Sequence, residues 1–311
     1  MADILELIQP PVRSLDRPIF HTRALAYWEL GKPRIATLVL AVTAVGFYLA
    51  LPAPWASPTV FVSLLHTMLG TLLAVMGANA LNQVLEVEYD RLMPRTANRP
   101  IPSSRLTSIE ASIFGVALVA LGTFYLMLSV GVVPGALAFA GGLSYVAMYT
   151  PLKREGAWCV YVGAVSGAMP MLIGWTAAGS SITLFAWILF AILFFWQLPH
   201  FASIAWMYRE EYALAGYPML PVVDATGVRT DLHVVTHTIA LMIVSLLPVL
   251  YGFTGYLYAI SAPVFGLAFL AYSIFFLAHK SRATARQHVI ASVIYLPLLL
   301  LSMMVDRVVV G

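Results

Sequence analysis

Three oxygen-bearing side chains recur at a four-residue spacing in the first third of the chain. Asn82, Glu86 and Asp90 stand at positions i, i+4 and i+8. On a helix this spacing places them on one face, with a drift of about 40° per step. Asn79, about one turn earlier, joins the same stripe. Carboxylate and amide oxygens suit Mg²⁺, which usually takes one or two carboxylates and completes its shell with phosphate oxygens and water.

Arginines follow this stripe directly. Arg91, Arg95 and Arg99 are spaced four residues apart, and guanidinium groups bind phosphate through paired hydrogen bonds. Together the acids and arginines predict a metal–phosphate site, because intramembrane acids are usually functional. The alternative reading is a solvated acidic and basic loop held by local ion pairs. Lys153 and Arg154 follow a later apolar run, where they either bind phosphate or serve as membrane anchors.

A third polar segment interrupts an apolar run between residues 194 and 224. Pro199 is expected to bend its helix or open a cavity there, and Gln197 and His200 flank it. Tyr208 and Glu211 follow in a connection. A histidine in this position is more often a packing residue than a catalyst, although a polar cavity nearby favours a functional role.

The composition indicates which elements position these residues. The 311 residues are 61% apolar and 10% charged, against about 25% charged in ordinary soluble domains, and the mean hydropathy is +0.88. One cysteine excludes a disulfide scaffold. We expect an all-α, polytopic helical bundle, since the runs are too apolar for a β-barrel. Nine runs approach the ~20 residues that span a bilayer: 35–51, 59–81, 109–129, 132–150, 158–178, 182–206, 233–253, 257–277 and 289–305.

Basic residues lie in alternate connections between these runs. Of the 17 lysines and arginines, all except Arg307 fall on one side of the predicted membrane. The positive-inside rule makes that side cytoplasmic, with the N-terminus inside and the active-site cavity opening there. We expect a cytoplasmic N-terminal segment (1–34), one membrane-embedded domain (35–305) and a short tail (306–311). A bacterial plasma membrane is the simplest location, and an organelle inner membrane is the alternative.

The sequence gives less support for a functional role of the histidines outside these segments. His233 and His237 are spaced i, i+4, which would allow a metal pair on a helix. No third ligand is evident, so we expect them to be packing residues. His279 and His288 fall in the last basic connection and are expected to flank the final helix.

The combined motifs resemble the UbiA superfamily of intramembrane prenyltransferases, and within it the protohaem IX farnesyltransferases (haem O synthases). Asn82, Glu86 and Asp90 match the first signature of that superfamily, Asn-x-x-x-Asp-x-x-x-Asp, with glutamate in the middle position. Further matches, which extend the resemblance over essentially the whole chain, are MPRTANRPIP at 93–102, YTPLKR at 149–154, WQLPHF at 196–201 and YREEYALAGYPMLP at 208–221.

The resemblance implies transfer of a farnesyl group from farnesyl diphosphate to a vinyl group of protohaem, with water added, to give haem O and diphosphate. It assigns catalysis to Asn82, Glu86, Asp90, Lys153 and His200, the first three as Mg²⁺ ligands. It assigns the binding of diphosphate or haem to Asn79, Arg95, Arg99, Lys153, Arg154, Gln197, His200, Tyr208 and Glu211. His200 would orient haem as an iron ligand or as a partner of a propionate or water. Haem is a substrate here and Mg²⁺ the cofactor.

The second acidic signature of the superfamily is not intact. Tyr208 and Tyr212 occupy its outer positions, and Glu210 and Glu211 are the remaining acids. The resemblance therefore supports a second Mg²⁺ less well than the first. Glu211 would instead position Lys153 or an arginine. The alternative function is prenylation of a quinone precursor or other aromatic acceptor. The resemblance leaves open farnesyl against geranylgeranyl, the oligomeric state, and docking of a haem A synthase or terminal oxidase. No nucleic acid is expected to bind.

Overall fold

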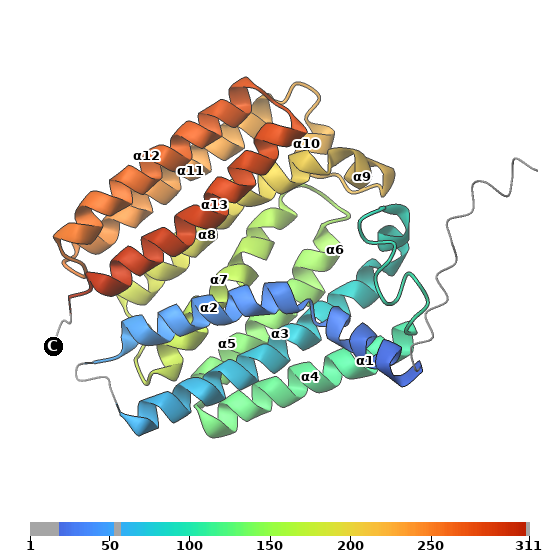
Figure 1. Ribbon diagram of the computed structural model, residues 1–311, viewed down its shortest axis with the longest axis horizontal. Helices are drawn as coiled ribbons and strands as arrows, with labels where there is room; N and C mark the ends of the chain where they lie inside the picture. The colour runs from blue at the N-terminus through green and yellow to red at the C-terminus, as the bar shows by residue number, and fades with distance from the viewer. Residues whose placement is uncertain (1–18, 53–56, 309–311) are drawn as a thin grey trace, which may run out of the picture.

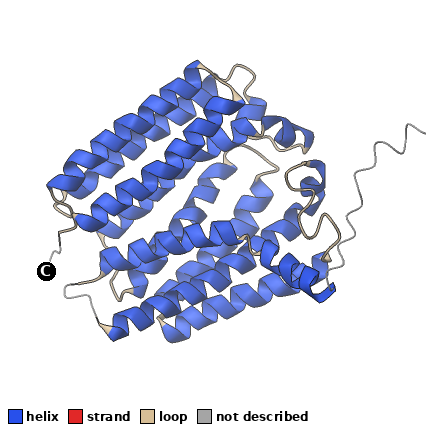
Figure 2. Ribbon diagram, in the orientation of Figure 1, coloured by secondary structure: helices blue, strands red, loops and turns tan. Residues whose placement is uncertain are grey.

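The computed structural model describes residues 19–52 and 57–308. These residues form helices and no strand beyond one isolated bridge between Thr254 and Arg307 (Figure 2). The elements are α1 (Ile19–Leu30), α2 (Pro33–Ala50), α3 (Pro58–Leu92), α4 (Ser108–Ser129), α5 (Val132–Leu143), the π-helix η2 (Ser144–Tyr149), α6 (Thr150–Leu152), α7 (Cys159–Ala177), α8 (Leu184–Met207), α9 (Arg209–Leu214), α10 (Leu220–Val223), α11 (Val228–Leu250), α12 (Tyr256–Ala278) and α13 (Arg282–Val305).

Nine helical segments within the described residues are long and apolar enough to cross a membrane, with α5, η2 and α6 together forming one of them. This confirms the predicted nine-span, all-α architecture. Two boundaries differ most from the prediction. The second span continues from residue 81 to Leu92, which carries the polar stripe on the same helix. The last span begins at Arg282 rather than 289, because Ser281 and Thr284 form a capping box at its start.

The long helices run side by side, and the short ones gather at one end of the bundle (Figure 1). α3 packs against α4, α2 against α7, α8 against α11, and α12 against α13. The largest buried cluster lies along α7, α8 and α13, and includes Leu172, Leu189, Ile192 and Leu299. The loop from α3 to α4 and helices α1, α6, α9 and α10 cover one end of this bundle.

A close approach of backbones joins α2 to α7. A Cβ atom placed on Gly174 would overlap the carbonyl oxygen of Thr43 and lie 2.8 Å from the amide nitrogen of Phe47. Only glycine leaves room for this contact. The contact fixes the distance between the helix that follows Lys32 and the helix that follows Lys153.

Part of the predicted N-terminal segment (1–34) is helical. Residues 1–18 lie outside the described residues, and the next twelve form the helix α1. Between α1 and α2, Lys32 adopts a left-handed backbone conformation with φ 49° and ψ 64°. Non-glycine residues adopt it only where the surrounding structure enforces it. This turn directs the chain from the end of the bundle into the first span.

Candidate functional site

The predicted polar stripe lies on the final turns of α3 and faces the interior of the bundle. Asn82 and Asp90 are fully buried, and Asn79 and Glu86 are nearly so. The Asn79 amide donates to the carbonyl of Gly31 over 3.0 Å. Asn82 donates to the Thr150 hydroxyl of α6 over 3.0 Å. α3 is thereby tied to both the α1–α2 turn and the end of the fourth span.

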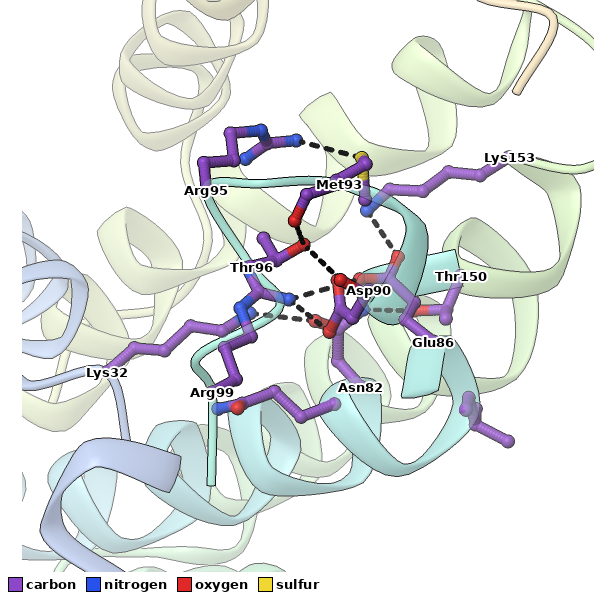
Figure 3. Close-up of polar contacts among 12 residues, drawn as sticks. Lys32, Asn82, Glu86, Asp90, Met93, Arg95, Thr96, Arg99, Thr150 and Lys153 are labelled. Atoms are coloured by element: carbon purple, nitrogen blue, oxygen red, sulfur yellow. Dashed lines mark hydrogen bonds and ion pairs between the residues drawn. The ribbon is translucent and has the colours of Figure 1, made fainter. Parts of the chain in front are cut away.

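Glu86 and Asp90 form the centre of a carboxylate cluster with Arg99 and Lys153 (Figure 3). The Lys153 ammonium lies 2.6 Å from Glu86 Oε1. The Arg99 guanidinium lies 2.6 Å from Asp90 Oδ2 and 3.9 Å from Glu86 Oε2, so it bridges the two acids. Burial alone would lower the pKa of Lys153, yet the Glu86 carboxylate holds it well above its ordinary value. Lys153 is therefore a permanent cation in this cluster.

Lys32 completes the carboxylate cluster, although the sequence did not single it out as a site residue. Its ammonium donates to Asn82 Oδ1 over 2.7 Å, as Figure 3 shows. Burial lowers the pKa of Lys32 to about 7, since its partner is a neutral amide rather than a carboxylate. The sequence signal was the position of Lys32 between Gly31 and Pro33 at a helix break.

The other predicted arginines lie nearer the rim. Arg95 lies 3.6 Å from Glu211, and its guanidinium stands 4.9 Å from the centre of the Tyr208 ring. Glu211 thus contacts an arginine, one of the two roles that the sequence left open. Arg154 stands over the Tyr89 ring at 4.6 Å and also bonds the carbonyl of Leu85. Through its hydrogen bond to α3, Arg154 lies at the rim of the site, at the same end of the bundle as Arg95.

Among the described side chains, Gln197 and His200 make no hydrogen bond or ion pair with the carboxylate cluster. Both bind neighbouring helices instead. The Gln197 amide donates to the carbonyl of Ala164 in α7 over 3.2 Å. The His200 ring bonds the Ser292 hydroxyl of α13 over 2.6 Å and stacks on Trp196. Their placement in the substrate site remains a prediction.

Two further expectations about histidines have different outcomes. The expectation for His288 is wrong, because this ring is fully buried inside the bundle. It bonds the hydroxyls of Ser203 and Ser273 over 2.7 and 2.9 Å, so it joins α8 to α12. His233 and His237 pack against each other, with ring centroids 4.2 Å apart, as expected for packing residues. The Tyr161 hydroxyl lies 3.5 Å from His233 Nδ1 and 3.4 Å from His237 Nε2.

The carboxylate cluster fits a magnesium ion that arrives with phosphate. No group of three or more histidine, cysteine, aspartate or glutamate side chains that could hold a metal occurs in the described part of the chain. Magnesium needs only one or two carboxylates when phosphate oxygens and water complete its shell. Glu86 and Asp90 supply two, and Asn82 adds an amide oxygen. Asp90 Oδ1 is buried without any hydrogen-bond partner, which leaves one acceptor ready for a cation.

Comparisons with known proteins agree with this architecture. The sequence pattern of the UbiA prenyltransferase family matches residues 39–296. The protohaem IX farnesyltransferase of Solibacter usitatus is 45% identical over 286 residues, which cover 90% of this chain and 98% of that protein.

Two solved structures share the fold. A digeranylgeranylglyceryl phosphate synthase has a TM-score of 0.76 at 17% identity, covering 91% of this chain and 98% of that one. A UbiA homologue from Archaeoglobus fulgidus, bound to DMAPP and Mg²⁺, has a TM-score of 0.65 at 15% identity, with 89% and 98% covered. The nine apolar helices and these matches make this chain an integral membrane protein. It belongs to the UbiA prenyltransferase family, in the branch of the protohaem IX farnesyltransferases.

Proposed function

We propose that this protein transfers a farnesyl group from farnesyl diphosphate to a vinyl group of protohaem IX, giving haem O. The carboxylate cluster carries the proposal, because two buried acids are surrounded by three cations at the end of an apolar bundle. An apolar interior suits a prenyl chain and a porphyrin, whereas the cluster suits a diphosphate and a metal. The relative from Solibacter usitatus bears the name of this activity.

Asn82, Glu86 and Asp90 would hold Mg²⁺, which when bound supplies positive charge that stabilises the leaving diphosphate. The homologue from Archaeoglobus fulgidus, bound to DMAPP and Mg²⁺, supports this choice of metal. The unpartnered Oδ1 of Asp90 supports it independently, since a buried acceptor without a donor is costly. A second metal has weaker support, because Glu211 is engaged with Arg95.

Lys32, Arg99 and Lys153 would bind the diphosphate. Each contacts a side chain assigned to the metal, so each lies close to a diphosphate that would bind that metal. Fixed cations aimed at a leaving group stabilise the charge that develops on it. The allylic C–O bond breaks with both electrons passing to the diphosphate, and the vinyl carbon bonds to the farnesyl carbon. Water then adds to the resulting cation and releases a proton.

Aromatic rings lie beside the same cations. The Lys153 ammonium stands 4.6 Å from the centre of the Tyr149 ring, and Tyr145 stacks on Tyr149. The faces of such rings attract positive charge. Tyr149 therefore stabilises the Lys153 ammonium beside the proposed diphosphate site. A role of His200 and Gln197 in binding the porphyrin stays a prediction.

The charge distribution supports the remaining assignments. Lys32, Arg99 and Lys153 lie at the end of the bundle where the basic connections converge. The positive-inside rule supports a cytoplasmic location of this end, and we propose the bacterial plasma membrane as the location of the protein. The bacterial source of the relative agrees with that location. A haem A synthase or terminal oxidase remains the candidate protein partner, as the consumer of the product.

An acceptor-competition assay tests the proposal. Purified protein receives Mg²⁺, farnesyl diphosphate and equal concentrations of haem b and 4-hydroxybenzoate, and the products are separated by chromatography. We expect haem O and diphosphate in equal amounts, with no prenylated benzoate. Prenylation of the benzoate without haem O would instead assign the protein to the quinone-precursor reaction. Omitting Mg²⁺ in a parallel reaction tests the metal separately.

A further inference from the structure

A groove, termed here the lateral groove, is lined by residues of α7, α8, α10 and α11. Its volume is about 430 Å³, within the usual range of small-molecule sites. Trp158 and Tyr161 at the start of α7 and Phe201 of α8 give it aromatic walls, and Pro221 of α10 lies at its edge. The groove can therefore hold a flat apolar molecule that reaches it from the bilayer.

His237 presents a nitrogen lone pair inside this lateral groove. Its Nδ1 bonds the backbone carbonyl of His233 over 2.6 Å. A carbonyl can only accept, so Nδ1 carries the proton and Nε2 is the unprotonated nitrogen. Nε2 lies 3.4 Å from the Tyr161 hydroxyl, which is long for a hydrogen bond. A histidine whose other ring nitrogen donates to a carbonyl has the arrangement typical of a metal ligand.

Arg229 adds a cation to the same groove. It lies two turns before His237 on α11 and is exposed. It takes part in no ion pair found within residues 19–52 and 57–308. Trp158, which is half exposed, also lines the groove, and tryptophan is common at the membrane–water interface. The groove thus combines an imidazole, aromatic walls and an unpaired cation.

One packed layer joins the groove to the carboxylate cluster. Ala205 and Met219 line the groove and belong to a buried cluster that also contains Met93. Tyr149 packs against this cluster, and Lys153 stands over the Tyr149 ring. A molecule in the groove would therefore contact the same packed layer that supports Tyr149 and Lys153 beside the diphosphate site.

We propose that the lateral groove is the docking site of protohaem, with His237 Nε2 as an axial ligand of the iron. An iron porphyrin matches the groove in each respect: its iron takes imidazole, its macrocycle is flat and apolar, and its propionates pair with guanidinium. Arg229 binds a propionate, and His233 holds the His237 ring in place. This proposal rests on the proposed function, because it names the site of that reaction's acceptor.

Haem titration of the purified full-length protein tests the proposal without turnover. Ferric haem b is added in the absence of Mg²⁺ and farnesyl diphosphate, and the Soret band reports iron ligation. We expect an imidazole-ligated spectrum in the wild type. H237A and the double variant H233A/H237A should lose that spectrum and bind haem about tenfold or more weakly. R229Q should keep the spectrum but weaken binding, and H279A, which changes an exposed histidine outside the groove, should match the wild type.

Two results would overturn the groove as the haem site. One is an unchanged spectrum and affinity in H233A/H237A. The other is loss of the imidazole spectrum in H200A but not in H237A, which would place the iron inside the bundle. Failure of the proposed function is a separate result. A wild type with a His237-dependent haem spectrum but no haem O product would retain the groove and reject the reaction.

Discussion

Replacing Asp90 with asparagine removes one carboxylate from the centre of the carboxylate cluster while keeping the shape of the side chain. Asp90 is 0% exposed, and its Oδ2 lies 2.6 Å from Arg99. In D90N the amide oxygen can still accept this hydrogen bond. A charge-assisted bond then becomes a bond to a neutral group, which costs about 1 kcal/mol of folding stability. The bundle should therefore remain folded.

The expected loss of turnover in D90N is far larger than this loss of stability. In the proposed site Asp90 supplies one of two carboxylates for the metal, and its Oδ1 has no hydrogen-bond partner in the described structure. Loss of a fixed group that stabilises developing charge costs about a hundredfold to a thousandfold in rate. We expect kcat to fall by about a thousandfold, or about 4 kcal/mol of transition-state stabilisation. The amount of Mg²⁺ needed for half-maximal rate should also rise.

Asp224 offers a matched control. It is another buried aspartate, 8% exposed, and it accepts bonds from the Thr230 amide and hydroxyl over 2.7 and 2.9 Å. D224N should cost about 1–3 kcal/mol of stability, because an amide nitrogen would meet these donors. Its kcat should nevertheless stay within about threefold of the wild type, since Asp224 touches no member of the cluster.

Haem O formation by chromatography and thermal unfolding in detergent measure the two effects on the same preparations. The reasoning is refuted if D90N keeps more than about a tenth of the wild-type kcat under saturating Mg²⁺. It is equally refuted if D90N and D224N lose turnover in proportion to their loss of stability. Either result would make Asp90 a structural residue.

Two further predictions concern the α1–α2 turn and the α2–α7 contact. K32M should lower kcat/KM for farnesyl diphosphate about tenfold or more by removing a charge-assisted hydrogen bond, whereas R34M, at an exposed arginine, should not; equal kinetics in the two variants would remove Lys32 from the site. G174A should destabilise the bundle by about 1–3 kcal/mol, because its Cβ would overlap the Thr43 carbonyl. G142A, where a Cβ has room, should unfold at the wild-type temperature, and indistinguishable unfolding of the two variants would contradict the close contact.

Hydropathy predicted the spans because it is a local property of the sequence. Each apolar run becomes one helix, and the four-residue spacing of Asn82, Glu86 and Asp90 becomes one buried face of α3. Ion pairs between these acids and nearby basic residues were the alternative reading of the segment, and Asp90 pairs with Arg99 in this way. These inferences required only helix periodicity and the rule that buried acids need cations.

The missed features depend on which helices become neighbours. Lys32 reaches Asn82 only because a left-handed residue turns the chain between α1 and α2. His288 seemed to flank a helix, but α13 begins earlier than hydropathy indicates and packs this ring between α8 and α12. Tyr161 meets His237 because α7 and α11 lie on either side of one groove. No local pattern encodes such contacts between distant segments.

The balance of charge in the carboxylate cluster indicates in which order a metal ion and a diphosphate would bind. Glu86 and Asp90 carry two negative charges, and Lys32, Arg99 and Lys153, when all are protonated, carry three positive ones. A divalent cation arriving alone would meet this positive surplus, and each carboxylate already has one oxygen paired with a basic side chain. An anionic diphosphate would engage the three cations and free the carboxylates for the metal. The structure therefore favours joint binding of diphosphate and metal over binding of the metal first.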